Sequence, residues 1–129
     1  MFTLNMITPH GKPRKIQTSI CNLVTPQGHM GVLSNHMPLV TMVEISMMTT
    51  IEDGSRKEYA VAGGLFFFKD NEATILSDAI ESEEEIDVQR ALDAKRRAEE
   101  RLKSQDPDID IKRAEIALRK ALNRINVSQ

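Results

Sequence analysis

Hydrophobic and polar positions alternate along the first eighty residues, in short runs that end at turn-forming residues. In residues 2–7 the apolar Phe2, Leu4 and Met6 alternate with polar neighbours, and a proline turn follows. Alternation with a period of two predicts a strand that buries one face. The same pattern, or enrichment in β-branched residues, predicts further strands at residues 16–24, 43–51, 57–62, 65–68 and 73–77.

The turns between these runs support a compact β fold. Asp53-Gly54 is a strong hairpin signal, because glycine tolerates positive φ. Gly63-Gly64 predicts a break or bulge before the next apolar run, in which Phe66 and Phe68 share one strand face and are expected in the core. Short strands with frequent turns predict a β-sandwich or flattened barrel of about ten short strands.

The pattern changes near residue 80 from alternation to a helical period. Of the first 80 residues 13 are charged, against 23 of the last 49, and no glycine lies in this last part. Ser82 and Glu85 form a capping box, which predicts a first helix from about Glu83 to Lys103. We therefore expect two domains, residues 1–82 and 83–129.

The end of the chain predicts a second helix, antiparallel to the first. The break between them offers Asp106 or Asp108 as a cap, and Pro107 suits a first helical turn. Each helix has a narrow apolar stripe, formed by Ala91, Ala94, Ala98 and Leu102 and by Ile111, Ala114, Leu118, Ala121 and Ile125. The short connection favours a helical hairpin. Because alanines bury little area, this hairpin should be only marginally stable alone.

The charge balance and the single cysteine narrow the possible roles. With 17 basic and 19 acidic residues the formal net charge is −2, which gives no reason to expect nucleic-acid binding. Cys21 alone forms neither an intramolecular disulfide nor a cysteine metal cluster, and the reducing cytoplasm is the simplest compartment. No run approaches the roughly 20 apolar residues of a membrane helix, so we expect membrane contact only through a partner.

Patterns typical of catalysis are missing. There is no phosphate-binding loop, no dinucleotide-binding glycine motif, no zinc-protease motif and no nucleophile elbow. His10, His29 and His36 are scattered among turn residues, so we expect no metal site. We therefore expect no enzymatic activity from this chain alone.

Residues 31–39 are rich in turn residues and yet carry several apolar side chains. In a monomer such residues pack under the sandwich. Met30 and Met37 on an exposed loop would instead mark a partner surface. The pattern leaves both interpretations open.

Charged residues of the two predicted helices allow a second kind of site. Asp87 and Arg90 lie three residues apart and so share a face with Arg97, and the second helix adds Arg113, Arg119, Lys120 and Arg124. In a closed hairpin, arginines and one carboxylate could surround an anionic ligand that carries hydroxyl groups. Spacing alone favours the simpler interpretation of surface ion pairs, each worth about 0.3–0.5 kcal/mol.

Several segments, taken in order, resemble the ε subunit of bacterial F-type ATP synthases over essentially the whole chain. They are ITPHGK (7–12), GHMGVLSNHMPLV (28–40), AVAGGLFFF (60–68), ATILSDAIE (73–81) and DIDIKRAEIALRKALNRINV (108–127), the last close to the Bacillus-type C-terminal helix. The resemblance implies a β-sandwich followed by a helical hairpin. It also implies a non-catalytic subunit of a rotary machine.

The resemblance implies partners and a location as well. In that family the sandwich binds the γ subunit and sits on the ring of c subunits, while the hairpin folds onto the sandwich or extends towards the α and β subunits. The extended form blocks ATP hydrolysis. The chain would lie on the cytoplasmic side of the bacterial cell membrane as a peripheral part of the proton-translocating complex. The contact residues implied are His29, Met30, Val32, Leu33, His36, Met37 and Pro38.

Some Bacillus-type relatives bind ATP in the folded hairpin through a motif written I/L-D-x-x-R-A. Ile86, Asp87, Arg90 and Ala91 match this motif, which implies ATP as a regulatory ligand with no metal required. The other ligand residues implied are Glu81, Arg97, Arg113, Lys120 and Arg124. Lys120 stands where the thermophilic version has arginine. Because lysine cannot make the same bidentate contact, we expect weaker affinity.

Two departures from the family pattern fall in the contact loop. His29 replaces a ring-facing glutamate, and Ser34-Asn35 replaces Pro-Gly before His36. They change the charge pattern expected at the c-ring. Two alternatives stay open: a coupling subunit whose hairpin regulates mechanically without ATP, and a generic β-sandwich adaptor whose helical tail docks a coiled-coil partner.

Overall fold

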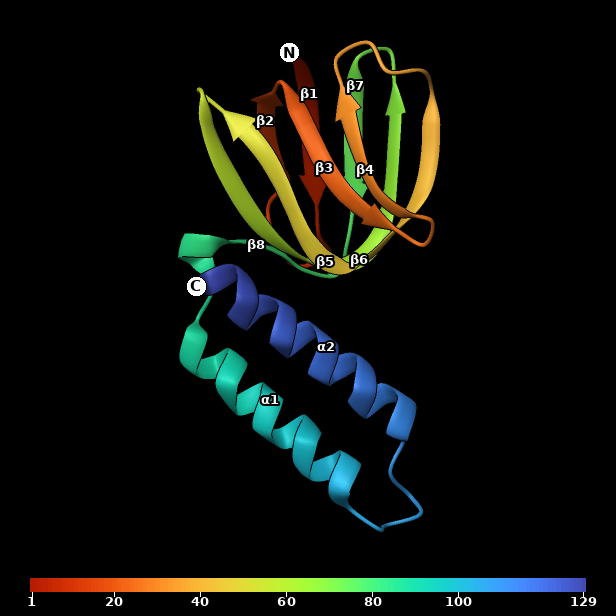
Figure 1. The fold of residues 1–129 in the computed structure, drawn as a ribbon, viewed down its shortest axis with the longest axis vertical. Coiled ribbons are helices and arrows are strands. Elements are labelled where there is room, and N and C mark those ends of the chain that lie inside the picture. The colour runs from red at the N-terminus through yellow and green to blue at the C-terminus, as the bar shows by residue number, and fades with distance from the viewer.

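A computed structural model describes residues 1–129 as a sandwich of strands followed by two helices (Figure 1). The elements are β1 (Phe2–Ile7), β2 (Arg14–Thr18), β3 (Ile20–Thr25), β4 (Gly28–Leu33), β5 (Leu39–Glu52), β6 (Ser55–Lys69), β7 (Glu72–Leu76), β8 (Ile80–Ser82), the 3₁₀ turn η1 (Glu83–Glu85), α1 (Val88–Lys103) and α2 (Ile111–Ser128). The predicted fold class is confirmed, although the sandwich has eight strands instead of about ten.

All eight strands belong to one sheet that folds over on itself. Seven follow the order β2-β1-β7-β6-β5-β3-β4, and β8 pairs with β6. Only β1 and β7 run parallel. The strands β5 and β6, of 14 and 15 residues, curve through the end of the sandwich nearest the helices and contribute to both layers (Figure 1). The middle of the β5–β6 hairpin therefore faces the helices.

Alternate apolar side chains fill the space between the two layers. Phe2, Phe66 and Phe68 are fully buried in a core cluster of 14 residues. The rings of Phe2 and Phe68 meet edge to face, with their centroids 5.4 Å apart. The prediction that Phe66 and Phe68 lie in the core is confirmed.

Several predicted strand limits are wrong: β4 was not predicted, β5 begins at Leu39 instead of residue 43, and two further limits differ for a local reason. The second predicted strand is split, because the Oγ1 of buried Thr18 donates to the Ile20 carbonyl at 2.6 Å and accepts from the Ile51 N–H at 3.1 Å. The strands predicted on either side of the glycine pair are one strand, β6. Gly63 and Gly64 have φ values of 80° and 144°, which bend the strand without ending it.

The predicted capping box does not start the first long helix. The Glu85 side chain accepts from the Ser82 N–H at 3.1 Å, but this bond closes only η1. α1 has its own cap, Asp87, whose Oδ1 accepts from the Arg90 N–H at 3.1 Å. Between the two caps Ile86 is buried in extended backbone, and this interrupts the helix.

The second helix also has a different cap from those predicted. Asp110 caps α2, its Oδ1 accepting from the Arg113 N–H at 3.0 Å. Asp106 is engaged in the connection, where it accepts from the Asp108 N–H at 2.9 Å. Pro107 therefore lies in the connection and not in a helical turn.

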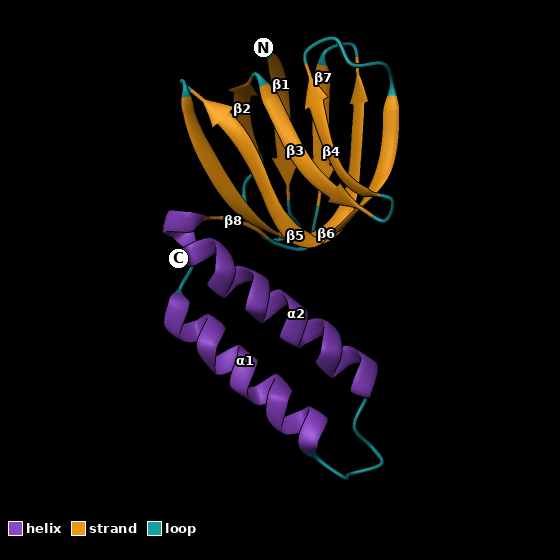
Figure 2. Cartoon of the chain, in the orientation of Figure 1, coloured by secondary structure: helices purple, strands orange, loops and turns teal.

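The helix α2 lies between the sandwich and α1 (Figure 2). Four alanines are buried in the hairpin: Ala91, Ala98, Ala114 and Ala121. At the end of α2, Val127 is buried in a small cluster with Ala60 of β6 and Ile86. Small side chains bring the backbones close but bury little apolar area, so the packing that holds the hairpin is modest.

Candidate functional site

The root of the hairpin brings a carboxylate and an arginine together. Arg124 of α2 faces Glu81 of β8, with Nε 2.8 Å from Oε1 and Nη2 donating to Oε2 at 3.2 Å. Their side chains keep 21% and 26% of their surface exposed. The Nε is buried and lies against the carboxylate, so guanidinium and carboxylate form a close ion pair, although the Nε–H makes no hydrogen bond of good geometry.

A cavity of about 170 Å³ lies beside this pair, between α2 and the sandwich. Its polar side carries Asp78, Glu81, Lys120, Asn123 and Arg124, and its apolar wall is formed by Ile45, Ala60, Val61, Ala62 and Ala79. An apolar wall that faces a few charged groups suits a ligand with a small apolar ring and polar groups along one edge of that ring. The volume is below the roughly 300–1,000 Å³ of sites that enclose a whole drug-sized ligand.

Asn123 attaches α2 directly to the sandwich. Its Nδ2 donates to the Ser46 carbonyl at 2.8 Å and to the Val61 carbonyl at 3.5 Å. These carbonyls belong to the middle of β5 and β6. A nearby ion pair, Arg119 with Glu44 at 3.8 Å, is exposed and adds little. Asn123 was not identified from the sequence, because an asparagine inside a helical pattern carries no sign of a contact 77 residues away.

The family motif at the start of α1 has mainly structural roles in this conformation. Ile86 and Ala91 are buried, the first against the sandwich and the second in the hairpin. The Asp87 carboxylate caps the helix. The side chain of Arg90 is exposed and forms no salt bridge.

The structure gathers only part of the implied ligand set. Three of the nine residues line the cavity: Glu81, Lys120 and Arg124. Arg97 and Arg113 are exposed and outside its lining. Nowhere in the chain do three His, Cys, Asp or Glu side chains gather in a way that could hold a metal ion.

A second ion pair fixes η1 to the sandwich. Arg14 of β2 donates from Nη2 to the Glu85 Oε1 at 2.6 Å, and its guanidinium lies 5.9 Å from the centre of the Tyr59 ring. The hydrogen bond to Glu85 raises the pKa of Arg14. Burial, and the bond that its hydroxyl donates to Glu52 at 2.7 Å, raise the pKa of Tyr59. Because 71 residues separate Arg14 from Glu85, no local pattern pairs them.

The connection between β4 and β5, which carries His36, Met37 and Pro38, lies at the end of the sandwich opposite the helices (Figure 2), whereas His29 and Met30 lie at the start of β4, at the other end. Met37 is 74% exposed and Leu33 also faces solvent. Val32 is fully buried in the core and Met30 packs against that core. Val32 therefore offers no side chain to a partner, which corrects the implied contact set, because alternation along β4 turns it inward.

The other residues of this loop lie at or near the surface. His29 and Pro38 are exposed, while His36 is half-buried with its ring 5.9 Å from that of Phe68. Asn35 has a φ of 63°, and its N–H donates to a side chain of the β6–β7 turn at 2.8 Å. Asparagine tolerates this left-handed conformation, so it can stand where the family has glycine.

A further apolar surface lies on the outer side of the layer formed by β5, β6, β7 and β1. The strand register places six apolar side chains there in two adjacent rows, Met42, Leu65, Leu76 and Ile7 in one and Val40 and Phe67 in the other. We call these six the outer apolar face; Val40 is 72% exposed. Its signal in the sequence is the unbroken apolar run 65–68, which leaves β6 apolar on both sides. Such a patch marks an interaction surface.

Two family descriptions together match the whole chain. "ATP synthase, Delta/Epsilon chain, beta-sandwich domain" matches residues 1–83, and "ATP synthase, Delta/Epsilon chain, long alpha-helix domain" matches residues 84–129. The chain belongs to the delta/epsilon family of ATP synthase chains. It is thus a non-catalytic subunit, and the family expected from the sequence is confirmed.

Several relatives of the family are similar over nearly their full length. The ATP synthase epsilon chain of Bacillus licheniformis is 40% identical over 126 residues, which cover 98% of this chain and 96% of that one. The ATP synthase epsilon chain of Ligilactobacillus salivarius is 38% identical over 133 residues, covering 100% and 96%.

Two solved structures share the fold. A chain of the Euglena gracilis mitochondrial ATP synthase (OSCP, F1 and c-ring) has a TM-score of 0.74 and 22% identity, covering 93% of this chain and 76% of that one. A chain of the Tetrahymena thermophila mitochondrial ATP synthase central stalk and c-ring has a TM-score of 0.58 and 13% identity, covering 98% and 92%. In the present chain neither helix combines the length and apolar character needed to cross a bilayer.

Proposed function

We propose that this chain is the ε subunit of a proton-translocating F-type ATP synthase and turns with its central stalk. One observation carries the proposal: an apolar docking face and a lightly packed hairpin occur together in a chain whose relatives are named ATP synthase epsilon chain. In this role the chain couples rotation to ATP synthesis. It lies on the cytoplasmic side of the bacterial cell membrane and reaches it only through the complex.

The outer apolar face supports docking of the γ subunit. Removing such a surface from water favours association by about 25 cal/mol per Å² of apolar area. The exposed Leu33 and Met37 support contact with the ring of c subunits. Only two residues separate Met37 from Val40 of the outer apolar face, so the two contacts adjoin.

The hairpin is suited to a two-state inhibitor. Its docked form rests on the buried alanines, on Asn123 and on the Arg124–Glu81 pair. Once released, the helices would extend towards the α and β subunits and oppose ATP hydrolysis. A ligand that binds only the docked form shifts this balance by its difference in affinity for the two forms.

ATP as the regulatory ligand fits the root of the hairpin in part. Lys120 and Arg124 are cations suited to phosphate, and Glu81 can accept from a ribose hydroxyl or an adenine amino group. Because the cavity of about 170 Å³ admits only part of a nucleotide, the rest would lie along the hairpin, near the arginines Arg90, Arg97 and Arg113. None of these contacts requires a metal.

A hairpin that regulates mechanically, without ATP, is the second candidate. The observation in its favour is that three of the implied ligand residues already have partners within the chain. Arg124 pairs with Glu81, and the Asp87 carboxylate caps α1. The docked form is therefore complete without a nucleotide.

An ATP titration of the full chain separates these two candidates. If ATP binds, the backbone NMR signals of Arg90 and Ala91 should shift in a saturable way, with or without magnesium. Arg124→Ala should abolish the shift, and Arg119→Ala, on the exposed side of the same helix, should preserve it. If millimolar ATP produces no saturable shift, ATP is excluded and the mechanical hairpin stands.

Co-purification tests the coupling role itself. The full chain, mixed with γ and the c-ring, should elute with both. Failure to join them would contradict the proposed role and leave the generic adaptor as the function.

A further inference from the structure

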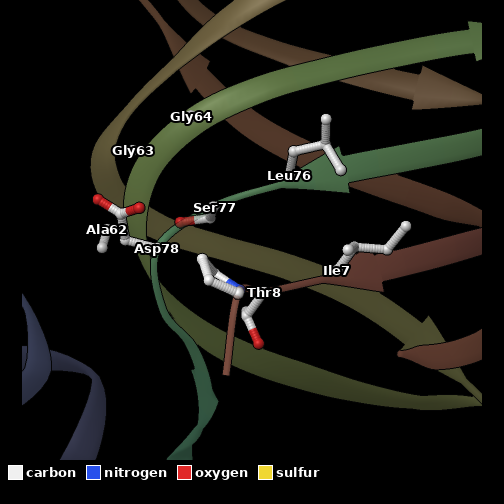
Figure 3. Close-up of a pocket in the computed structure, with 9 residues that line it drawn as sticks. Ile7, Thr8, Ala62, Gly63, Gly64, Leu76, Ser77 and Asp78 are labelled. Carbon is white, nitrogen blue, oxygen red and sulfur yellow. The ribbon is translucent and has the colours of Figure 1, made fainter. Parts of the chain in front are cut away.

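A groove of about 400 Å³ opens where β1 and β7 end beside the middle of β6. Its floor is the backbone of Gly63 and Gly64. The side chains of Ile7 and Leu76 lie on one side of it, and Asp78 lies at the other end (Figure 3). The groove therefore has an apolar part and a carboxylate part.

The glycines make this floor possible. A Cβ at Gly64 would lie 1.9 Å from the Leu76 carbonyl oxygen, and one at Gly63 would lie 3.3 Å from the Val43 carbonyl oxygen. β6 consequently approaches both neighbouring strands with no side chain between them. The floor is bare backbone, which a side chain from outside can cover.

The groove continues the outer apolar face. Ile7 and Leu76 belong to both, and Asp78 is exposed and forms no salt bridge. Glu44 lies outside the groove and forms a weak ion pair with Arg119, so Asp78 is the only carboxylate in the lining. No lysine or arginine lines the groove itself, although its Asp78 also borders the cavity lined by Lys120 and Arg124. Within the groove the carboxylate favours a cationic group over an anionic one.

We propose that the groove receives a positively charged side chain of the γ subunit. An aliphatic residue of γ covers the backbone of Gly63-Gly64, and a neighbouring lysine or arginine pairs with the Asp78 carboxylate. This proposal rests on the proposed docking of γ to the outer apolar face. It adds a charged contact that fixes how the two subunits are aligned. An apolar surface alone tolerates sliding, whereas a charge pair at one end fixes the register of the two subunits.

Binding of the full chain to a purified γ–c-ring complex, measured at several salt concentrations, tests the groove. Asp78→Asn keeps the shape and removes the charge. It should weaken binding about 3- to 10-fold at low salt and reduce the salt dependence. Asp78→Lys should weaken binding further. Asp70→Asn is the matched control, because Asp70 is an exposed aspartate of the β6–β7 turn outside the groove. It should bind like the parent chain.

Val40→Asp tests the underlying docking face separately and should abolish binding. If it does so while Asp78→Asn behaves like Asp70→Asn, the docking face stands and the role of the groove is refuted. If Val40→Asp binds like the parent chain, the docking face is refuted and the groove proposal falls with it. Recovery of Asp78→Lys binding by a lysine-to-glutamate or arginine-to-glutamate change in γ would support the proposal. Thermal unfolding of each variant shows that it is folded.

Discussion

Asn123 of α2 donates a hydrogen bond to the carbonyl oxygen of Ser46 in β5, across 2.8 Å and 77 residues of sequence. It links the mobile half of the proposed switch to the backbone of the sandwich. The acceptor is a backbone carbonyl, which a substitution does not remove and which does not titrate. This hydrogen bond can therefore be removed only by replacing Asn123.

Asn123→Ala should loosen the docked hairpin while leaving the sandwich intact. Losing one such bond costs about 1 kcal/mol, which corresponds to about fivefold more opening. Hydrogen exchange of the α1 and α2 amides should accelerate by that factor, with β-strand amides unchanged. Asn126→Ala, at an exposed position of the same helix, is the control. Equal exchange in the two variants would show that Asn123 does not hold the hairpin.

The Arg14–Glu85 pair should make the root of the hairpin sensitive to acid. Burial alone would raise the pKa of Glu85, but the hydrogen bonds from Arg14 and Ser82 outweigh it and lower this pKa below its usual value. A carboxylate with a depressed pKa stabilises the fold above its unfolded pKa, about 4.3, and this contribution is lost as pH falls through the folded pKa.

Glu85→Gln should therefore be less stable than the parent chain at pH 7. Its stability should also fall less between about pH 5 and pH 3. Thermal unfolding across this range measures both effects. Glu84→Gln, an exposed neighbour in η1, should follow the parent curve. Parallel curves for Glu85→Gln and the parent chain would contradict the predicted role of the pair.

Gly64→Ala should be among the most damaging single substitutions in the sandwich. The added methyl group would lie 1.9 Å from the Leu76 carbonyl oxygen, and φ at this position is 144°. Because backbone must move to relieve this contact, we expect a loss of about 3 kcal/mol or more in the free energy of unfolding. Urea denaturation measures it. Gly31→Ala, whose methyl group would meet only side-chain atoms, of Asn22 at 3.1 Å and of Ile20 at 3.5 Å, should lose far less.

Cys21 should be chemically silent in the folded chain. Burial raises the pKa of its thiol to about 12, so almost no thiolate exists at pH 8. Iodoacetamide should leave the native protein unmodified and label it fully in denaturant. Ser55→Cys places a second thiol at the exposed start of β6 and should be labelled at once. Rapid labelling of Cys21 in the native chain would contradict its burial.

Lys120→Arg should tighten ATP binding if the proposed ligand is correct. Arginine offers two parallel donors to a phosphate where lysine offers a point charge. We expect about 3- to 10-fold higher affinity, measured by calorimetry. Lys112→Arg, an exposed position near the start of α2, should leave the affinity unchanged. An unchanged affinity in Lys120→Arg would exclude a bidentate phosphate contact at this position.

Local sequence patterns predicted which strands and helices are present better than the residues at which they begin and end. The change in period near residue 80 and the Asp53-Gly54 turn located the change from strands to helices and the β5–β6 hairpin, because both signals act over a few residues. The start of α1 was misplaced because a capping box at Ser82 also closes a single 3₁₀ turn. Burial of Ile86 against the sandwich, a tertiary effect, decides where the helix begins.

The candidate site was predictable only through family resemblance. That resemblance placed Glu81, Lys120 and Arg124 together, and the structure gathers them at one cavity. It did not reveal Asn123 or the Arg14–Glu85 pair. Both are contacts between distant parts of the chain, which periodicity along one segment cannot show.

The alanines buried in the hairpin also affect what happens when it opens. Separating α1 from α2 exposes mainly the methyl groups of alanines. A helix interface built from leucine or phenylalanine would expose a much larger apolar area. An opened hairpin therefore exposes little apolar surface through which other protein chains could associate non-specifically. If the hairpin opens as proposed, the subunit should therefore open and close repeatedly without aggregating.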